Sequence, residues 1–256
     1  MRFKGKVTIG NCTLYLADCA DVIPSIDTVD LVFADPPYGQ SQNGDTVCVT
    51  GNRPSKVRQA NGRVINVDRK PRRPIIGDDQ PFDPESLLAI NAKDYLIWGA
   101  HKFADRLPEG SWLVWDKMPN GKVKHQGCGE AAWTSLRQPM RIYRLLWDGL
   151  CVGSAARTEV TAGQKRLHPA QKPVALMVWC LSFFPCVQSI FDPYMGVGSI
   201  GLAAMKLGIS YTGVEIDPHY FDIAVDRLRR AHRQPTLFEL LDPVPTEMTD
   251  LFAGGS

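Results

Sequence analysis

The amino-acid sequence predicts an α/β fold built on a doubly wound, mostly parallel sheet. Short apolar segments, rich in β-branched and aromatic residues, alternate with helical segments along the chain, which is the order typical of parallel strands. Two of these apolar segments end in turns that carry an aspartate, Asp35 and Asp192. Ligands of open α/β sheets bind at the carboxyl ends of the strands, so both aspartates are expected at a binding edge.

Four strands are predicted in the first half of the core, residues 1–116. Each is a short apolar run bounded by polar or turn-forming residues: residues 12–17, 29–34, 95–98 and 112–115. Helical segments are expected between them, first after Asp18 and later over residues 102–107. A further helix begins at Asp83 and Pro84, where an acid caps the helix and a proline occupies its first turn.

The turn over residues 35–38, Asp-Pro-Pro-Tyr, is the first motif that indicates chemistry. Its prolines end the strand before it, because a proline lacks an N–H for the ladder and fixes its own φ. The carboxylate of Asp35, the carbonyl of Pro36 on a rigid turn and the ring of Tyr38 together suit a planar group that bears an amino nitrogen, such as a nucleobase. The alternative, a surface turn stopped by prolines, is disfavoured by the buried strand that precedes it.

A basic stretch follows this turn directly. Residues 39–76 contain eight lysines and arginines against two aspartates, and they lack apolar periodicity. They are predicted to form a long loop over the same pocket. The simplest interpretation of such a charge run is a solvated loop, and the second is phosphate contact through Arg53, Lys56 and Arg58.

A second basic region, residues 117–166, interleaves lysines and arginines with aromatic residues. Within it, residues 140–145 alternate like a half-exposed strand, with basic side chains expected on one face. Arginines can contact phosphates and guanine edges, so Arg141 and Arg144 are candidates for target recognition. The alternative is that both arginines only solvate the outer face of that strand.

A glycine turn near the carboxyl end is the second motif. Residues 189–194 predict a strand, residues 195–201 turn into a helix that Gly208 ends, and the next strand ends at Glu215. The spacing is that of the dinucleotide fingerprint, which by itself favours a nicotinamide dehydrogenase. Asp192 discriminates between a nicotinamide dinucleotide and a methionine-derived nucleoside. A carboxylate there repels the pyrophosphate of the first but attracts the ammonium or sulfonium of the second.

Several classes of protein are disfavoured by composition. No apolar run approaches the ~20 residues that span a bilayer, and the first residues lack the apolar core of a secretory signal. Seven cysteines without a CxxC pair indicate reduced thiols in a cytosol, and His125 with Cys128 is a poor metal pair. Cys186 follows a proline, as in enzymes that attack the cytosine ring with a thiolate, but it precedes a strand and is expected to be buried and structural.

With both turns considered together, the chain resembles the amino-methyltransferases of DNA, which use S-adenosylmethionine. The order, with Asp-Pro-Pro-Tyr first and the glycine turn near the carboxyl end, is similar to that of their beta subgroup. Residues 168–173, His-Pro-Ala-Gln-Lys-Pro before a helix, are also typical of that subgroup. The resemblance implies a Rossmann-like methyltransferase core with permuted motif order. Departures from the pattern are Tyr194, Met195 and the long loop after Tyr38.

The resemblance also assigns roles residue by residue. It implies that Asp35, Pro36, Pro37 and Tyr38 are catalytic, with the target base rotated out of the duplex to stack on Tyr38. The residues that it implies bind the cofactor S-adenosylmethionine are Asp18, Lys172, Phe191, Asp192, Pro193, Gly196, Gly198, Ser199, Glu215 and Asp217. No metal is expected in this chemistry.

The implied function is methyl transfer from S-adenosylmethionine to the N6 amino group of adenine in double-stranded DNA. Cytosine N4 methylation is the runner-up, and a nicotinamide-dependent oxidoreductase or a non-enzymatic nucleic-acid-binding module are alternatives from other classes. The domains expected are a catalytic half, a target-recognition region, a cofactor-binding half and a tail: residues 1–116, 117–166, 167–234 and 235–256. The resemblance further implies restriction-modification, action in the bacterial cytoplasm (as a bacterial or phage protein) and a homodimer, and it leaves open a partner restriction endonuclease.

Overall fold

The structure, a computed structural model, describes ten parts of the chain: residues 3–37, 39, 55–58, 64–67, 75–119, 127–148, 151–152, 155–156, 167–168 and 170–233. The chain divides into two compact units, one of Met1–Pro36 with Asp83–Ser256 and the other of Pro37–Phe82. Tyr38, Arg53 and the predicted tail, residues 235–256, lie outside the described residues.

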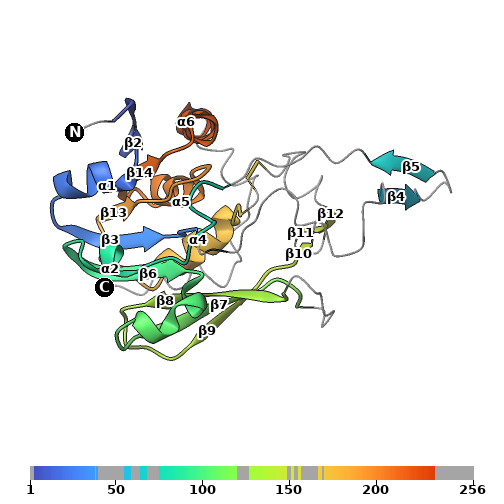
Figure 1. Ribbon diagram of the computed structural model, residues 1–256, viewed down its shortest axis with the longest axis horizontal. Helices are drawn as coiled ribbons and strands as arrows, with labels where there is room; N and C mark the ends of the chain where they lie inside the picture. The colour runs from blue at the N-terminus through green and yellow to red at the C-terminus, as the bar shows by residue number, and fades with distance from the viewer. Residues whose placement is uncertain are drawn as a thin grey trace. The chain divides into compact units, whose positions relative to one another are not determined.

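A nine-stranded sheet forms the centre of the larger unit (Figure 1). Its strands, in spatial order, are β1 (Gly5–Ile9), β2 (Cys12–Leu16), β14 (Ser210–Glu215), β13 (Ser189–Asp192), β3 (Val29–Ala34), β6 (Ala92–Trp98), β8 (Gly129–Thr134), β7 (Ser111–Asp116) and β9 (Arg141–Arg144). The five strands from β2 to β6 run parallel, while β1 and β8 pair antiparallel with their neighbours. The predicted fold class, a mostly parallel α/β sheet, is therefore confirmed.

The central strands form where the sequence has nearly continuous apolar runs. In β3, Leu31, Val32, Phe33 and Ala34 are fully buried, as expected for a strand covered on both faces. All four strands predicted in the first half of the core are present, and so are those that lead to Asp192 and Glu215. Sequence patterns identify such strands well, because both faces must be apolar.

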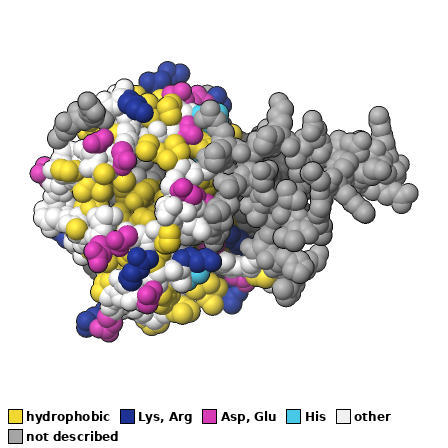
Figure 2. Space-filling view, viewed as in Figure 1, with side chains coloured by type: hydrophobic (Ala, Val, Ile, Leu, Met, Phe, Trp, Pro, Cys, Tyr) yellow, Lys and Arg dark blue, Asp and Glu magenta, His cyan; other side chains and the backbone are white. Residues whose placement is uncertain are grey.

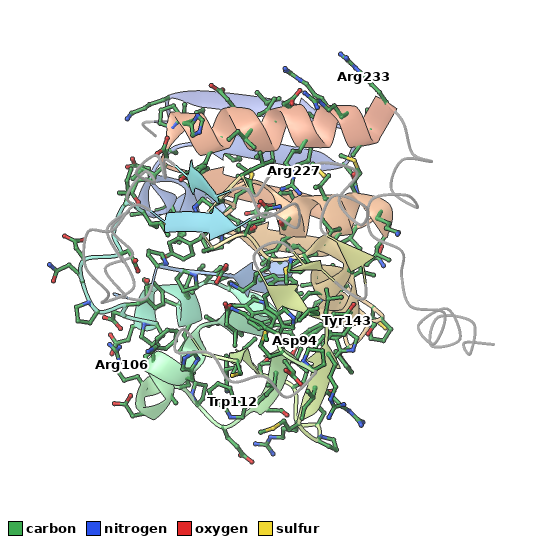
Figure 3. The ribbon with its side chains drawn as sticks, turned by 90° about the vertical axis from the view of Figure 1, so that its right-hand side faces the viewer. Asp94, Arg106, Trp112, Tyr143, Arg227 and Arg233 are labelled. Carbon is green, nitrogen blue, oxygen red and sulfur yellow. The ribbon has the colours of Figure 1, made fainter. Side chains whose placement is uncertain are left out.

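Helices cover the sheet. Their bounds are α1 (Cys19–Val22), α2 (Glu85–Leu88), α4 (Val174–Leu181), α5 (Ser199–Lys206) and α6 (Pro218–Arg233), with 3-10 turns at Ile23–Ser25, Ala100–Lys102 and Ala104–Arg106. Helix α5 contacts α4, α6 and β14, and α6 also contacts β1 and β2, so these three helices form one layer. Arg227 of α6 donates to the carbonyl of Val197, whereas Arg233 extends from the end of the helix (Figure 3). The helix predicted over residues 102–107 is instead split into two 3-10 turns, because the buried Phe103 between them leaves helical geometry.

Residues 129–144 belong to the core sheet, which corrects the predicted separation of residues 117–166 from it. Strand β8 lies between β6 and β7, and β9 extends the sheet beyond β7. Only the short strands β10 (Trp147–Asp148), β11 (Cys151–Val152) and β12 (Ala155–Ala156) form a sheet of their own among the described residues of that region. The strand predicted over residues 140–145 is confirmed as β9. The expectation that its basic side chains share one face is wrong, since Arg141 and Arg144 are three residues apart and a strand alternates with a period of two.

The smaller unit, Pro37–Phe82, contains an antiparallel pair of strands, β4 (Ser55–Arg58) and β5 (Val64–Val67). The prediction of a structureless loop over residues 39–76 is therefore wrong for these two segments. The β-branched residues Val57, Val64, Ile65 and Val67 favour a strand pair, and the charges that surround them obscured this pattern.

Two further expectations concern cysteines and membranes. Cys186 is exposed rather than buried, because it lies in the turn before β13, while Cys12 and Cys180 are buried thiols. No group of three potential metal ligands occurs among the described residues. In the same part of the chain, no helix combines the length and apolar character needed to cross a membrane.

Candidate active site

The two predicted turns lie side by side at the carboxyl edge of the parallel strands. Strand β3 pairs directly with β13, with Val32 opposite Phe191, so Asp35 and the glycine turn leave the sheet at the same edge. Glu215 ends β14, the next strand along, and its carbonyl accepts from Ala17 N at 3.0 Å. The prediction that turns far apart in sequence become neighbours is confirmed.

The glycine turn has one open glycine and one packed glycine. Both have positive φ, +53° at Gly196 and +77° at Gly198. A Cβ built on Gly196 meets nothing within 4 Å, whereas one on Gly198 lies 2.8 Å from Leu228 of α6. Gly198 is therefore needed for helix packing, and Gly196 leaves room for a ligand to approach the backbone.

Glu215 holds this turn from the neighbouring strand. Its Oε2 accepts from Gly196 N at 2.8 Å, and its Oε1 accepts from Asp217 N, also at 2.8 Å. Burial raises the pKa of Glu215 to about 7, although the backbone donors oppose the rise. Asp217 accepts from His219 N at 2.8 Å and so fixes the first turn of α6.

Asp192 lies beneath the turn and is fully buried. Tyr211 donates its hydroxyl to Oδ2 at 2.8 Å, and Tyr194 donates its backbone N–H to Oδ1 at 3.1 Å. Burial raises the pKa of Asp192 to about 8. Both oxygens therefore have donors within the protein itself. Phe191 is also fully buried, so its side chain packs in the core and positions the strand end.

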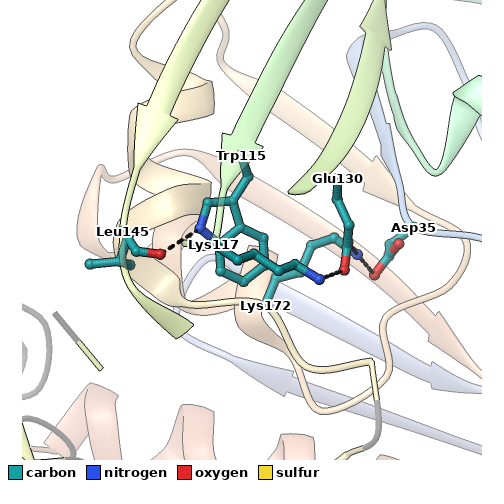
Figure 4. A network of polar contacts seen from close by, with 6 residues as sticks. All are labelled: Asp35, Trp115, Lys117, Glu130, Leu145 and Lys172. Atoms are coloured by element: carbon teal, nitrogen blue, oxygen red, sulfur yellow. Dashed lines mark hydrogen bonds and ion pairs between the residues drawn. The ribbon is translucent and has the colours of Figure 1, made fainter. Parts of the chain in front are cut away.

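Asp35 is bound by a lysine from the other half of the chain (Figure 4). Lys172, just before α4, is 4% exposed and donates Nζ to Asp35 Oδ2. The same Nζ lies 3.3 Å from Glu130 Oε2 and 5.3 Å from the ring centroid of Trp98. The sequence predicts that Lys172 binds the cofactor. In the structure it instead donates a hydrogen bond to Asp35, the carboxylate that is predicted to be catalytic.

Glu130 and Lys117 complete a chain of charges that alternate in sign, from Asp35 through Lys172. Lys117 donates Nζ to Glu130 Oε1. The sequence interpretation missed both residues, because it assigned residues 117–166 to target recognition. A signal does exist, since Glu130 is the charged residue in the segment Gly-Glu-Ala-Ala-Trp-Thr that forms β8.

The second oxygen of Asp35, Oδ1, is buried and has no hydrogen-bond partner among the described residues. Burial raises the pKa of Asp35, and the charge of Lys172 opposes this rise. A buried acceptor without a donor is costly, which makes it a candidate for binding a donor from a ligand. Ser199, at the start of α5 on the adjacent turn, likewise has a buried Oγ without a partner in the described part of the chain.

Asp18, the arginines of β9 and the basic residues of β4 are further predicted site residues. Asp18 follows β2 at the same edge, but it is exposed and accepts from Ala20 N at 2.9 Å as a cap of α1. Arg141 and Arg144 are exposed on β9, and Arg144 Nε lies 3.9 Å from Asp116 Oδ2. Lys56 and Arg58 belong to β4 in the smaller unit. On the face in Figure 2, the described basic side chains are scattered among acidic ones and form no continuous stripe.

Comparison with known proteins identifies related sequences. Residues 114–226 match the family model of the N6 and N4 methyltransferases, described as DNA methylase. The type II methyltransferase M.HinfI of Haemophilus influenzae is 36% identical over 100 residues, which cover 38% of this chain and 27% of that protein. The type II methyltransferase M.ScaI of Streptomyces caespitosus is 40% identical over 77 residues, which cover 27% of this chain and 25% of that protein. The matched segments thus span about a quarter of each curated relative.

Among solved structures, PvuII DNA methyltransferase, described as cytosine-N4-specific, has a similar fold. It matches with a TM-score of 0.50 and 13% identity, covering 98% of this chain and 95% of that one. The fold of this chain is therefore similar to that of a DNA methyltransferase.

Proposed function

We propose that this chain is a member of the N6/N4 DNA methylase family and that it transfers a methyl group from S-adenosylmethionine to the N6 amino group of adenine in double-stranded DNA. The observation that carries the proposal is the unpaired Oδ1 of Asp35, buried beside the turn that has room for a ligand at Gly196. Such a reaction requires an acceptor for the amino group close to a binding site for the nucleoside cofactor. Asp35 and the glycine turn at Gly196 follow adjacent strands, so both can serve one site.

Asp35 acts on the nucleophile in this proposal. The lone pair of an exocyclic amino group is delocalised into the ring, so the group is a poor nucleophile. Oδ1 of Asp35 and the carbonyl of Pro36 accept the two amino hydrogens, which draws the nitrogen toward a tetrahedral shape and directs its lone pair at the methyl group. Pro37 stiffens the turn, and Tyr38 stacks on the rotated base.

When bound, the cofactor would supply a methyl group already activated by its sulfonium. The nitrogen–methyl bond would form as the sulfur–methyl bond breaks, S-adenosylhomocysteine would leave with that electron pair, and Asp35 would accept the proton that the amino group loses. We assign its binding to the turn between Asp192 and Ser199, with Gly196 allowing close approach of the backbone. In this assignment Glu215 would accept from the ribose hydroxyls, and Asp18 would lie on the adenine side. Asp192 acts from below the turn as a buried acid whose charged form is favoured by a cationic ligand.

Adenine is preferred to cytosine as the acceptor because position 35 carries an aspartate, where the resemblance associates cytosine N4 methylation with a serine. The similarity to PvuII DNA methyltransferase, whose name states cytosine N4, keeps cytosine as the second candidate. One experiment separates them. The protein is incubated with S-adenosylmethionine labelled in the methyl group and with unmethylated DNA, and the labelled nucleoside is identified by mass spectrometry. N6-methyladenine is expected, and N4-methylcytosine alone would refute the choice of base.

The other classes of function give different results in a calorimetric titration. A methyltransferase binds S-adenosylhomocysteine, whereas a dehydrogenase binds a nicotinamide dinucleotide and not that ligand. A nucleic-acid-binding module binds DNA without transferring label.

The proposal also includes a restriction-modification role in the bacterial cytoplasm, a homodimer and a partner nuclease. It is supported by the two relatives named above, each of which carries the name type II methyltransferase.

A further inference from the structure

The Lys172 ammonium is shared between two carboxylates. It donates to Oδ2 of Asp35 and forms an ion pair with Oε2 of Glu130 at 3.3 Å, an oxygen that has no hydrogen-bond partner among the described residues. A lysine ammonium carries three N–H donors on a flexible stem, so its position depends on the acceptors around it. Where this cation settles therefore decides which oxygen of Asp35 remains available.

Glu130 is itself held firmly at its other oxygen. Lys117 donates to Oε1, and the Lys117 Nζ lies 4.9 Å from the ring centroid of Trp115, whose indole donates to Leu145 O at 3.1 Å (Figure 4). Trp115 is also the cross-strand partner of Glu130. Burial opposes the charge on Glu130, but Lys172 and Lys117 outweigh it and lower its pKa to about 2. Glu130 is thus a fixed, ionised anchor.

We propose that Glu130 is a positioning residue for methyl transfer: it holds the Lys172 ammonium on Oδ2 of Asp35 and so leaves Oδ1 free for the target amino group. This inference rests on the proposed function. Without Glu130, the Lys172 ammonium loses the second of these two carboxylates and can bridge both oxygens of Asp35, which occupies the acceptor that the reaction needs. Glu130 touches neither the base nor the cofactor in this scheme.

The charges around Asp35 give the proposal a signature beyond a loss of rate. Asp35 is faced by Lys172 and Lys117, which lower its pKa, and by Glu130, which raises it; Asp35 in turn raises the pKa of the buried Asp192. Neutralising Glu130 therefore lowers the pKa of Asp35. Since Asp35 must be ionised to accept the amino hydrogen, the acid limb of the pH–rate profile moves to lower pH.

The test compares Glu130→Gln with wild type and with Glu109→Gln. Glu109 forms an exposed ion pair with Arg137 at 3.0 Å, which makes it a matched control on the same sheet unit. Single-turnover transfer of labelled methyl to PCR-amplified, hence unmethylated, DNA is measured across pH, and S-adenosylhomocysteine binding is measured by calorimetry. Glu130→Gln is expected to slow transfer roughly tenfold to a hundredfold, with an acid limb at lower pH and unchanged S-adenosylhomocysteine affinity. Glu109→Gln is expected to match wild type.

A second variant covers the case in which Glu130→Gln does not fold. Lys117→Gln removes a charge that lowers the pKa of Asp35, so its acid limb is expected at higher pH. The inference would be overturned if the variants are active but the acid limbs of their pH–rate profiles do not move. It would also be overturned if the loss of rate is no larger than the fraction of variant protein that is unfolded. Either result would leave the proposed function standing. Wild-type protein that transfers no methyl would instead refute the proposed function, and the inference with it.

Discussion

Lys172 donates to the carboxylate of Asp35, although 137 residues separate the two in the chain. The contact joins the strand end of β3 to the segment before α4, and so links the predicted catalytic half with the predicted cofactor-binding half. With Glu130 at 3.3 Å, the buried lysine lies between two half-buried carboxylates. Its removal should therefore affect both the stability of the fold and the state of Asp35.

Replacing Lys172 by methionine is expected to lower the free energy of unfolding by about 3–5 kcal/mol, because the change removes a buried cation and leaves two half-buried carboxylates without it. Denaturant unfolding measures the change. Arg230→Met is the control, since Arg230 pairs with Asp226 at 2.7 Å on the exposed face of α6 and should contribute about 0.5 kcal/mol or less. Equal losses in the two variants would contradict the assignment of Lys172 to the interior of the site.

Asp35→Ala should lower the rate of methyl transfer by roughly a hundredfold or more, because the acceptor for the amino hydrogen is lost. Affinity for S-adenosylhomocysteine should persist, since the glycine turn is intact. Labelled transfer and calorimetry on the same preparation test both statements. Transfer that survives the change would remove Asp35 from the reaction.

Alanine at Gly196 and at Gly198 should have different consequences. Both positions have positive φ, so either change strains the backbone by about 1–2 kcal/mol. At Gly198 the new methyl also meets Leu228 at 2.8 Å, so the thermal transition should fall further. At Gly196 the methyl projects into open space, so the fold should tolerate it while S-adenosylhomocysteine binding is lost. Comparable binding in the two variants would contradict a ligand at Gly196.

The stability of the fold should decrease as pH rises from about 4 to about 8. The pKa of Asp192 is raised from 3.8 to about 8 by burial, so in this window the folded protein keeps a proton that the unfolded chain releases. The free energy of unfolding therefore falls with rising pH, and Glu215, with a pKa of about 7, adds to the slope. Asp192→Asn should flatten the slope in denaturant unfolding at several pH values. An unchanged slope would show that another group is responsible.

Charge removal should separate general from sequence-specific DNA contacts. Neutralising Arg53, Lys56 and Arg58 should weaken binding to all sequences alike and flatten its salt dependence. Replacing Arg141 or Arg144 should instead change the preference among sites, because arginines can contact base edges. Binding titrations at several salt concentrations on a library of duplexes distinguish the two. If changes at Arg53, Lys56 and Arg58 alter site preference while changes at the two β9 arginines do not, the two groups have the opposite roles.

The strands and the two turns could be predicted because their signals are local. Buried parallel strands such as β3 need continuous apolar runs, and an aspartate after such a run must lie at the carboxyl edge. The adjacency of β3 and β13 followed from the requirement that donor and acceptor meet, and the register confirms it.

The partners of Asp35 could not be predicted, because they depend on pairing between strands. Glu130 reaches the edge only because β8 runs antiparallel between β6 and β7, which places its first residues where the parallel strands end. Arg141 and Arg144 were assigned to one face although their spacing of three excludes it. In both cases the pairing and alternation of the strands, and not the residue type, decide where the side chain lies.

A crystal structure with bound S-adenosylhomocysteine tests the central claim most directly, namely that the two turns form one transfer site. The sulfur is expected at the Gly196 turn, within roughly 7 Å of Asp35 Oδ1, which leaves space for one methyl group and one amino nitrogen between them. A ligand bound elsewhere, or a sulfur separated from Asp35 by protein atoms, would contradict the account.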